Sequence, residues 1–414
     1  LAGNTPPKGH LPLAQAYAGH QFGGWVPQLG DGRALLLGDL IAPDGKVYDL
    51  QLKGAGRTPF SRGGDGRAWL GPVLREYIVS EAMHALAIPT TRALAAVATG
   101  ETVRREGAMP GAILTRVARS HLRVGTFQYF AARQDIEGLE ALVKFAIERH
   151  YPQATTPLEL LAEVVRAQAN LVAAWMSVGF IHGVMNTDNC TISGETIDYG
   201  PCAFIDGYHP QTVFSSIDQY GRYAYDKQAN IAGWNLAQLA SSLLPLMGAR
   251  DAAIEEATRV VNGFGATYQA AYIARFGSKL GLENPSADDL PHISGLLAIM
   301  ADEEADFTNT FRALAEGENP LPESPAFAEW HATWQKRSGL SGPDLALMRR
   351  SNPALIPRNH RVEAAIQAAL TGDLAPTARL ITALAEPYEP DESSDDLRLP
   401  PRPEEAIAAT FCGT

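Results

Sequence analysis

A change of sequence pattern near residue 125 divides this chain into two parts. The first part is rich in glycine and contains short runs of β-forming residues, separated by turn signals such as Pro43-Asp44-Gly45. One helix interrupts these runs, and its apolar spacing places it from about Pro72 to Leu86. The second part carries helical periodicity almost throughout, so the pattern predicts an α+β fold with strands first and helices after them. The expected strands cover residues 34–42, 47–53 and 111–118.

The second part contains one helix with a well-marked start. Thr156 to Glu159 form a capping box with proline at the first helical position, and Gly179 ends the apolar stripe that follows. Residues 180–204 alternate polar residues with Ile and Phe, which indicates a hairpin that carries a site. The tail from residue 386 to 403 holds six acids and five prolines, and we expect an extended or mobile linker there. Further helices are expected at about 227–247, 251–275, 292–315, 325–337 and 361–386.

The composition excludes several classes of protein. Apolar residues make up 46% of the 414 residues, which is enough for sizeable cores and excludes wholesale disorder. The net charge of −12 disfavours nucleic acid or an anionic membrane as a general partner. Cys190, Cys202 and Cys412 are too few and too widely spaced for a disulfide framework or a zinc knuckle, and they favour a reducing compartment. No stretch is long and apolar enough for a membrane span. The first residues resemble neither a protein start nor a signal peptide, so we expect that the chain begins inside a longer protein.

The first part contains residues that could hold phosphate groups. Gly30 and Gly32 lie with Arg33 in the turn LGDGR, and glycine allows backbone N–H groups to approach phosphates closely. A hairpin turn without any phosphate site would have the same sequence pattern. Lys53 ends an apolar strand, which is the place of the phosphate-binding lysine in protein kinases. The following helix supplies Glu76 and Glu81, and the pattern alone does not decide which of them pairs with Lys53 or whether both are solvated.

The segment HGVMNTDN, residues 182–189, resembles the catalytic loop of kinases. His182 and Asn189 have the expected spacing, but Val184 occupies the place of the catalytic aspartate, and Asp188 stands immediately before Asn189. Asp198 begins the motif DYG, which matches the metal-binding Asp-Phe-Gly of kinases with Tyr for Phe. Asn189 and Asp198 offer hard oxygen ligands for Mg²⁺, and Asp188 is a candidate base. An Asn-rich turn with incidental acids is the alternative.

Two arginines stand near the change of pattern, seven residues apart. Arg116 and Arg123 could join Arg33 and Lys53 around a polyphosphate, where they would stabilise a leaving group that carries several negative charges. A solvated basic face is an equal alternative from the sequence alone.

These residues, together with the segments PLAQAYAGHQFG (12–23) and NPALIPRNH (352–360), resemble the selenoprotein O family of kinase-fold proteins. The resemblance extends over nearly the whole chain, and it includes the motifs QLGDGRA (28–34), QLKGAGRT (51–58) and GDGR (64–67). It implies a bilobal protein-kinase-like fold, with a small β-rich N-lobe that has one helix packed behind the sheet and a large, mostly helical C-lobe. The implied parts are an N-lobe at 1–125, a C-lobe at 126–386 and an acidic, proline-rich tail at 387–414.

The resemblance also implies an activity. Members of this family are protein adenylyltransferases that bind ATP in an orientation flipped relative to kinases and transfer AMP to Ser, Thr or Tyr hydroxyls of proteins, with pyrophosphate as the leaving group. The cofactor implied is Mg²⁺, with Mn²⁺ possible, and neither nucleic acid nor a membrane is an expected partner. The base would be Asp188, the metal ligands Asn189 and Asp198, and the partner of Lys53 would be Glu76. The residues implied to contact ATP are Gly30, Gly32, Arg33, Lys53, Asp65, Gly66, Arg116, Arg123 and Asp198.

Three points stay open at this stage. Cys412 occupies the place where some relatives have selenocysteine, and a disulfide from there to the segment that contains Cys202 is a family possibility, although an idle cysteine fits equally well. Val184 leaves two other functions open, namely phosphoryl transfer of the kinase type and a non-catalytic, nucleotide-binding pseudokinase scaffold. We expect a cytoplasmic location for a bacterial protein, and a mitochondrial one for a eukaryotic relative.

Overall fold

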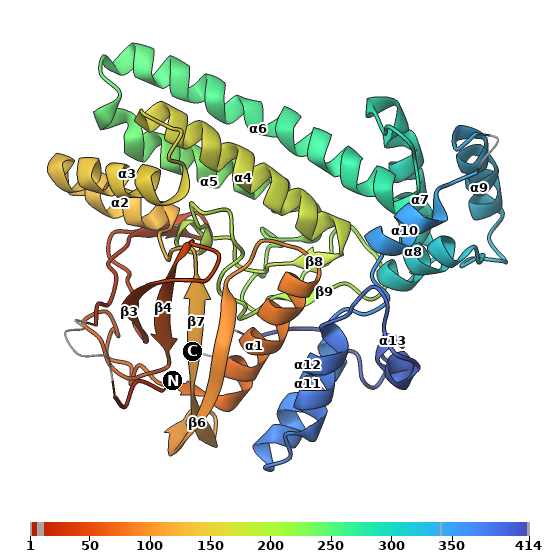
Figure 1. Cartoon of the computed structure of the whole chain (residues 1–414), viewed down its shortest axis with the longest axis horizontal. Coiled ribbons are helices and arrows are strands. Elements are labelled where there is room, and N and C mark those ends of the chain that lie inside the picture. The colour runs from red at the N-terminus through yellow and green to blue at the C-terminus, as the bar shows by residue number, and fades with distance from the viewer. Residues whose placement is uncertain (1, 6–11, 340–341, 412–414) are drawn as a thin grey trace.

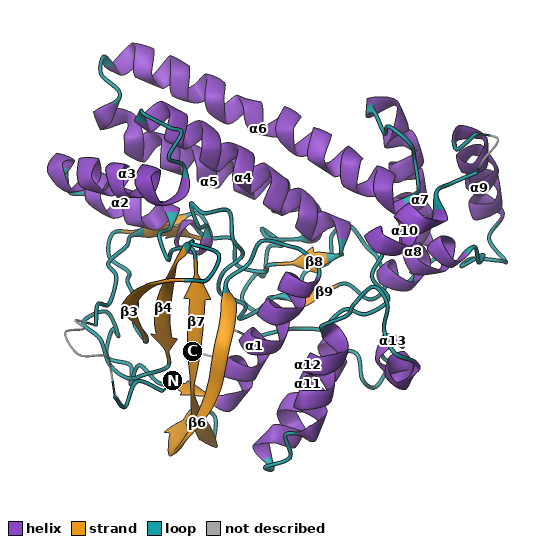
Figure 2. Cartoon of the chain, viewed as in Figure 1, coloured by secondary structure: helices purple, strands orange, loops and turns teal. Residues whose placement is uncertain are grey.

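The computed structural model describes residues 2–5, 12–339 and 342–411. It is a mixed α and β structure in which the strands and α1 occupy one side and the long helices α4, α5 and α6 lie side by side above them (Figures 1 and 2). The strands are β1 Gly19–Gln21, β2 Gly24–Val26, β3 Ala34–Ile41, β4 Val47–Lys53, β5 Ala68–Trp69, β6 Arg92–Arg104, β7 Ala108–Ala118, β8 Phe180–Ile181 and β9 Ala203–Phe204. The helices are α1 Leu70–Ala85, α2 Val124–Ala132, α3 Ile136–His150, α4 Pro157–Ser177, α5 Gln228–Leu243, α6 Arg250–Lys279, α7 Leu290–Asp302, α8 Phe307–Glu316, α9 Pro325–Arg337, α10 Leu345–Ser351, α11 Asn359–Leu370, α12 Ala375–Leu384 and α13 Asp395–Arg398.

The main sheet has five antiparallel strands, in which β3 pairs with β4, β4 with β7, and β7 with both β5 and β6. The three expected strands are confirmed, as is the helix between them, which begins two residues before Pro72. β6 was not expected, because its sequence ALAAVATGETV is rich in alanine and contains glycine, both of which are depleted in strands. Its backbone pairs with β7 all the same, because the turn between them brings the two strands together.

The helical part follows the expected pattern in outline, but two of the expected helices are each broken in two, and α10 was not expected. Thr156 caps α4 by accepting a hydrogen bond from the backbone N–H of Glu159 at 3.2 Å, as the capping box predicts. The helix expected at 292–315 is in fact two helices, because Asp306 caps a new helix, α8, with a bond from Asn309 N at 2.7 Å. The helix expected at 361–386 is likewise broken into α11 and α12 at Gly372, whose φ of +93° ends the helix. None of the described helices combines the length and apolar character that a bilayer span requires.

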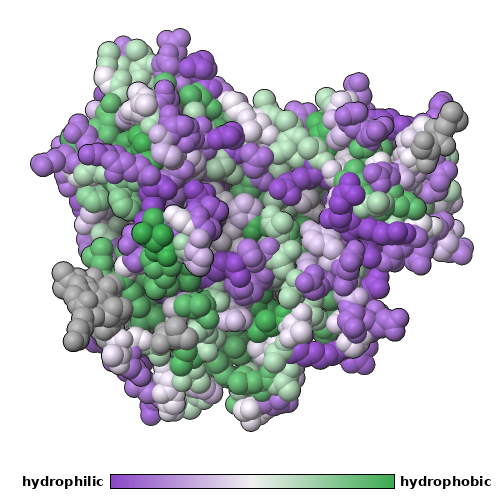
Figure 3. Space-filling view, viewed as in Figure 1, coloured by the Kyte–Doolittle hydropathy of each residue, from purple (hydrophilic) through white to green (hydrophobic). Residues whose placement is uncertain are grey.

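The structure contains two hydrophobic cores. The larger lies among the long helices, and the smaller joins α1, β6 and β7 to α11 and α12. The paired helices α11 and α12 therefore cover the side of α1 that faces away from the sheet (Figure 1). Apolar residues also gather on the molecular surface over the strands, in the lower half of Figure 3.

The expectation of an extended linker in the acidic tail is wrong in part. Residues 392–398 form a helical turn and the short helix α13, and Leu397 is buried in the smaller core. Asp396 forms an ion pair with Arg379 on α12. These contacts hold the turn in place, because one apolar side chain is buried while the acids face solvent or arginine. A count of acids and prolines does not reveal such an arrangement.

Lys279, at the end of α6, is a charged residue inside the larger core. Its side chain is 2% exposed, and its ammonium lies 4.2 Å from the ring centre of Phe311 and 5.5 Å from that of Phe307. Burial lowers the pKa of Lys279 from 10.5 to about 7.

We expect Lys279→Met to raise the free energy of unfolding at neutral pH. Because the folded pKa lies below the unfolded value, the unfolded chain binds more protons between about pH 7 and 10.5, so wild-type stability rises with pH across that window. Methionine fills a similar volume without charge and removes this rise. Urea unfolding below, within and above the window measures the effect, with the half-exposed Lys227→Met as control. A wild-type pH dependence in Lys279→Met would contradict the assignment.

Candidate active site

Lys53, at the end of β4, lies between two carboxylates. Its Nζ is 2.6 Å from Glu76 Oε2 on α1 and 2.6 Å from Asp198 Oδ1. Side chains alternate along a strand, and Lys53 points to the face of the sheet on which Glu76 also lies. Glu81, further along α1, instead accepts bonds from the Arg92 guanidinium with both carboxylate oxygens. The structure therefore separates the two glutamates that the sequence left as alternatives.

Arg116 on β7 joins this cluster from the neighbouring strand. Its Nη1 is 3.1 Å from Glu76 Oε1 and 2.8 Å from Asp198 Oδ1, and its Nη2 donates to Gln51 Oε1 at 2.5 Å. Gln51 stands directly opposite Arg116 in the pairing of β4 with β7, so the two side chains share one face of the sheet. Arg116 is only 1% exposed, so it is not part of a solvated basic face.

Arg123, which precedes α2, supplies a third cation. Its Nη2 lies 3.6 Å from Asp198 Oδ2 and 3.8 Å from Asp31 Oδ1, and its guanidinium stands over the ring of Tyr17 at 4.6 Å. Asp31 belongs to the Gly-rich turn and also accepts a hydrogen bond from Gln51 Nε2 at 3.0 Å. Three cations and three carboxylates thus form one connected network.

Asp198 is the centre of this network. Burial alone would raise the pKa of its carboxyl, but the positive charges of Lys53, Arg116 and Arg123 outweigh that effect and hold the pKa well below its usual range. Its backbone adopts a left-handed φ of 63°, which is uncommon outside glycine and turns the carboxylate toward the cations. The preceding carbonyl, that of Ile197, accepts a hydrogen bond from His182 Nε2 at 2.8 Å, which fixes this turn.

Asp188 and Asn189 lie on a short 3-10 turn, Thr187–Asn189. Burial raises the pKa of Asp188 to about 6. One carboxylate oxygen, Oδ2, accepts a hydrogen bond from Gln21 Nε2 at 3.1 Å, while Oδ1 is buried without a partner in the described structure. Asn189 Nδ2 donates to the Val184 carbonyl at 3.0 Å, which leaves the amide oxygen of Asn189 available as a ligand.

The Gly-rich turn is covered by the loop that follows Lys53. A Cβ on Gly30, whose φ is +141°, would lie 2.4 Å from the ring of Phe60, so this position needs glycine. A Cβ on Gly32 would lie 3.0 Å from the Phe60 carbonyl, which is a tight contact. The same loop contains Asp65 and Gly66, and the Gly66 carbonyl accepts a bond from Gly56 N at 3.0 Å.

Asp65 has partners of its own, apart from the cluster around Lys53. Its carboxylate binds the Arg105 guanidinium at 2.9 and 3.0 Å, and this pairing is the main reason that the pKa of Asp65 falls to about 2. Arg33 is placed next to the cluster, since its carbonyl accepts a bond from Gly54 N at 2.7 Å.

The chemistry of two residues fits a hard divalent cation. Asp198 is ionised, and Asn189 presents an amide oxygen whose NH₂ group is already used. Within the described ranges no group of three or more His, Cys, Asp or Glu side chains forms a metal site. A divalent cation held by these two residues would need further ligands, and Mg²⁺ usually takes such ligands from phosphates and water.

Several residues that contact this site were not predicted from the sequence. Asp31 and Gln51 connect the cations to the Gly-rich turn, and Gln21 binds Asp188. A signal existed for Gln51, which stands two residues before Lys53 and therefore on the same face of β4. Gln21 lies in the segment PLAQAYAGHQFG, but its contact with Asp188 had no local signal, because 167 residues separate the two.

Comparison with known proteins identifies the family. The family profile described as "Protein adenylyltransferase SelO" matches residues 3–385. The chain belongs to the SelO family. It is 60% identical to "Protein nucleotidyltransferase YdiU" of Ruegeria sp. (strain TM1040), over 100% of this chain and 88% of that protein. It is 56% identical to the protein of the same name from Nitrobacter hamburgensis, over 100% of this chain and 86% of that protein. The resemblance found in the sequence is thereby confirmed, and the chain is a nucleotidyltransferase.

Two of the cysteines of this SelO family member are buried thiols. Cys202 Sγ donates to the Tyr199 carbonyl at 3.4 Å, and burial raises the pKa of both Cys202 and Cys190 to about 12. Cys412 lies outside the described residues. Thr410, two residues before it, donates from Oγ1 to the Pro201 carbonyl at 2.6 Å, so the end of the described chain runs beside the segment that contains Cys202.

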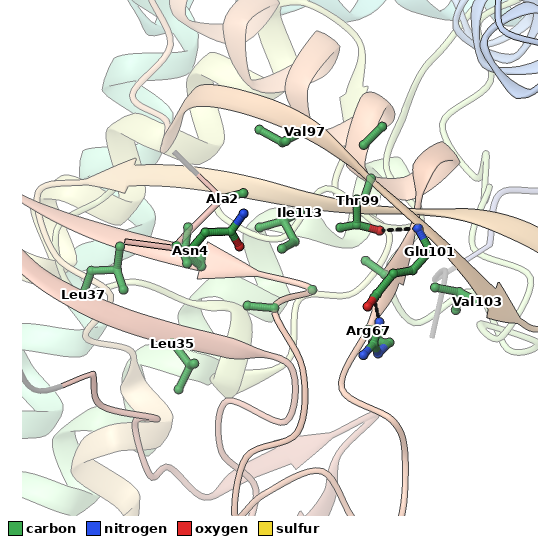
Figure 4. Close-up of a pocket in the computed structure, with 18 of the residues that line it drawn as sticks. Ala2, Asn4, Leu35, Leu37, Arg67, Val97, Thr99, Glu101, Val103 and Ile113 are labelled. Carbon is green, nitrogen blue, oxygen red and sulfur yellow. Dashed lines mark hydrogen bonds and ion pairs between the residues drawn. The ribbon is translucent and has the colours of Figure 1, made fainter. Parts of the chain in front are cut away.

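A cavity of about 410 Å³ lies against the main sheet, and Leu35, Val97 and Ile113 are among the residues that line it (Figure 4). Leu52 lines it, and this residue alternates along β4 with the two site residues Gln51 and Lys53. The ion pair between Arg67 and Glu101 lies at one end of the cavity in Figure 4. The sheet therefore separates this cavity from the charged cluster in the SelO family member.

Proposed function

We propose that this chain transfers AMP from ATP to the hydroxyl of a Ser, Thr or Tyr residue in a protein, with release of pyrophosphate. One observation carries the proposal, namely the convergence of Lys53, Arg116 and Arg123 on the single carboxylate of Asp198. A triphosphate carries several negative charges, and two buried arginines with a partly buried lysine stabilise such a leaving group strongly.

The nucleotide orientation follows from where the cations and the base lie. Lys53, Arg116 and Arg123 would hold the β and γ phosphates deep in the site, which leaves the α phosphorus facing the incoming hydroxyl. Asp188 would accept the proton of that hydroxyl, because it has an unpaired oxygen and its pKa of about 6 suits a base at neutral pH. The base then need not stand at the position of Val184. Gly30, Gly32, Arg33, Asp65 and Gly66 would complete the ATP site from the Gly-rich turn and the loop over it.

Asn189 and Asp198 would hold Mg²⁺, or Mn²⁺ in its place, on the charge and ligand type described above. The ion, when bound, neutralises phosphate charge. Asp198 contacts the same three cations, so it would link the metal to the residues that hold the phosphates.

Several wider features belong to the same proposal. We interpret the architecture as a bilobal protein-kinase-like fold divided at about residues 125 and 386, since a lysine on a strand pairs with a glutamate on the helix behind the sheet, as in kinases. The proposal also includes a redox role for Cys412 with Cys202. The partner is a protein rather than nucleic acid or a membrane, and the location is the cytoplasm. The similar proteins come from bacteria, which supports that location.

The test is incubation with Mg²⁺ and ATP labelled either at the α or at the γ phosphate, followed by intact-mass analysis. AMP transfer gives label from the α phosphate only. Transfer of the γ label would make the chain a kinase, and binding of ATP without any transfer would make it a scaffold. Asp188→Ala should reduce transfer by about 100-fold or more while changing ATP affinity little. Equal losses in both quantities would contradict the role of Asp188 as base.

Glu76 and Glu81 provide a matched pair of variants on one helix. We expect Glu76→Gln to reduce AMP transfer by about 100-fold, because Lys53 and Arg116 lose the carboxylate that positions them. Glu81→Gln should leave transfer within about twofold, since Glu81 binds only Arg92 and the adjacent backbone, away from the cluster. Initial rates with α-labelled ATP measure both, and equal effects of the two variants would contradict the positioning role of Glu76.

A further inference from the structure

A groove of about 590 Å³ lies at the tip of the β1–β2 hairpin, and Gln21 of the same hairpin binds the candidate base Asp188. One wall is Phe22 at the tip of the β1–β2 hairpin, and the remaining walls come from residues 217–222 and the start of α5. Three of its apolar side chains are exposed, at 96% for Tyr220, 52% for Ile217 and 37% for Phe22. Large apolar side chains exposed together around one groove are typical of an interaction surface.

Hydrogen bonds fix this groove to the segment that carries Asp188. The backbone N–H of Phe22 donates to Asn186 Oδ1 at 3.0 Å and to the Tyr223 hydroxyl at 3.2 Å. That hydroxyl in turn donates to Asn186 Oδ1 at 2.6 Å. Gln21, the residue before Phe22, binds Asp188 directly. The groove and the base are therefore held at a constant separation.

The charged groups of the groove are mainly positive. Arg222 stands over the Trp234 ring at 5.1 Å, and its Nε is buried without a hydrogen-bond partner in the described structure. Lys227 is half-exposed, with Asp226 3.8 Å away. The carboxylate of Asp218 is already used, since it accepts bonds from the backbone N–H groups of Arg222 and Tyr223 at 2.9 and 2.7 Å. An incoming acidic side chain would thus meet two cations.

We propose that this groove binds an extended segment of the protein that receives AMP. The segment has a large apolar side chain that contacts Ile217 and Tyr220, and an acidic side chain that meets Arg222 and Lys227. Phe22 lines the groove, and the residue before it, Gln21, binds Asp188. An extended chain advances about 3.3–3.6 Å per residue, so the two side chains of the bound segment would lie within a few residues of the modified hydroxyl. The inference rests on the proposed function, because it takes the acceptor to be a protein.

The test uses an array of short peptides with a central Ser, Thr or Tyr, in which each flanking position is varied. The array is scored twice, once for binding of the labelled protein without ATP and once for transfer of the α label. We expect peptides with an apolar and an acidic residue near the hydroxyl to give the highest score in both. Ile217→Ser should weaken binding about tenfold, and Ile254→Ser, a half-exposed isoleucine on α6, serves as its control. Lys227→Glu should shift the preference from acidic to basic peptides, with the exposed Lys144→Glu as control.

The two scores separate this inference from the proposed function. Groove-dependent binding without transfer of label would refute the proposed function and leave the groove as a peptide site. If transfer does not depend on the flanking residues and is unchanged in Ile217→Ser, the proposal that the groove binds the acceptor segment is refuted. Absence of binding to every peptide would also refute the groove as a peptide site. A change of oligomeric state in Ile217→Ser with unchanged peptide binding would refute it too, because a second copy of the chain would then occupy the groove.

Discussion

Asp198→Asn is expected to reduce AMP transfer by about 1,000-fold. The substitution keeps the size of the side chain but removes the charge that Lys53, Arg116 and Arg123 share, and it removes the charged ligand proposed for Mg²⁺. The three cations would then repel one another with less compensation, so their positions around the phosphates would change. Initial rates of label transfer from α-labelled ATP at saturating Mg²⁺ measure the loss.

Asp206 offers a matched control for this substitution. It lies in the same part of the chain, its side chain is 18% exposed against 20% for Asp198, and it pairs with a single arginine, Arg358. Asp206→Asn should cost stability, yet the folded fraction should retain transfer. Comparable rate losses per folded molecule in the two variants would show that Asp198 acts through stability alone.

Arg116→Met is expected to lower the free energy of unfolding by about 3–5 kcal/mol. The guanidinium of Arg116 is buried and donates hydrogen bonds to Glu76, Asp198 and Gln51. Its loss therefore leaves two carboxylates and an amide oxygen with fewer partners in a site that is largely shielded from water. Urea unfolding followed by circular dichroism measures the change, and ATP with Mg²⁺ is left out so that ligand binding does not mask it.

Arg92→Met is the corresponding control. Its side chain is 40% exposed, and Glu81 remains partly solvated when the pair is broken, so the expected loss is about 1 kcal/mol or less. Arg116→Lys should fall between the two, because lysine keeps the charge but cannot bridge three partners. A loss for Arg116→Met no larger than that for Arg92→Met would contradict the view that the buried network depends on this arginine.

Much of the fold could be predicted because local signals agreed with the final structure. The capping box at Thr156 marks the start of α4, and the apolar runs of β3 and β4 mark two strands of the sheet. The signals failed where tertiary pairing outweighed propensity. β6 is a strand because it pairs with β7, and the break between α7 and α8 depends on a cap at Asp306 inside an otherwise helical pattern.

The candidate site divides in the same way. The spacing of His182, Asn189 and Asp198 was readable because these residues lie close together in the chain. The choice between Glu76 and Glu81 could not be read from the sequence pattern. Five residues along a helix place the two side chains about 140° apart around its axis, and the sequence does not state which side faces the sheet. The contact of Gln21 with Asp188 depends on chain segments that meet only in the folded protein, so it has no local signature.

The position of α1 between the sheet and the pair α11–α12 bears on how such an enzyme can be controlled. Apolar residues on α1 share the smaller core with both neighbours, and Arg75 on α1 forms an ion pair with Glu363 on α11 at 3.2 Å. Swinging α1 outward would expose that core, so the pairing of Lys53 with Glu76 is a standing arrangement rather than a switch. A mechanism that controls catalysis in this enzyme would then have to act somewhere other than on the position of α1.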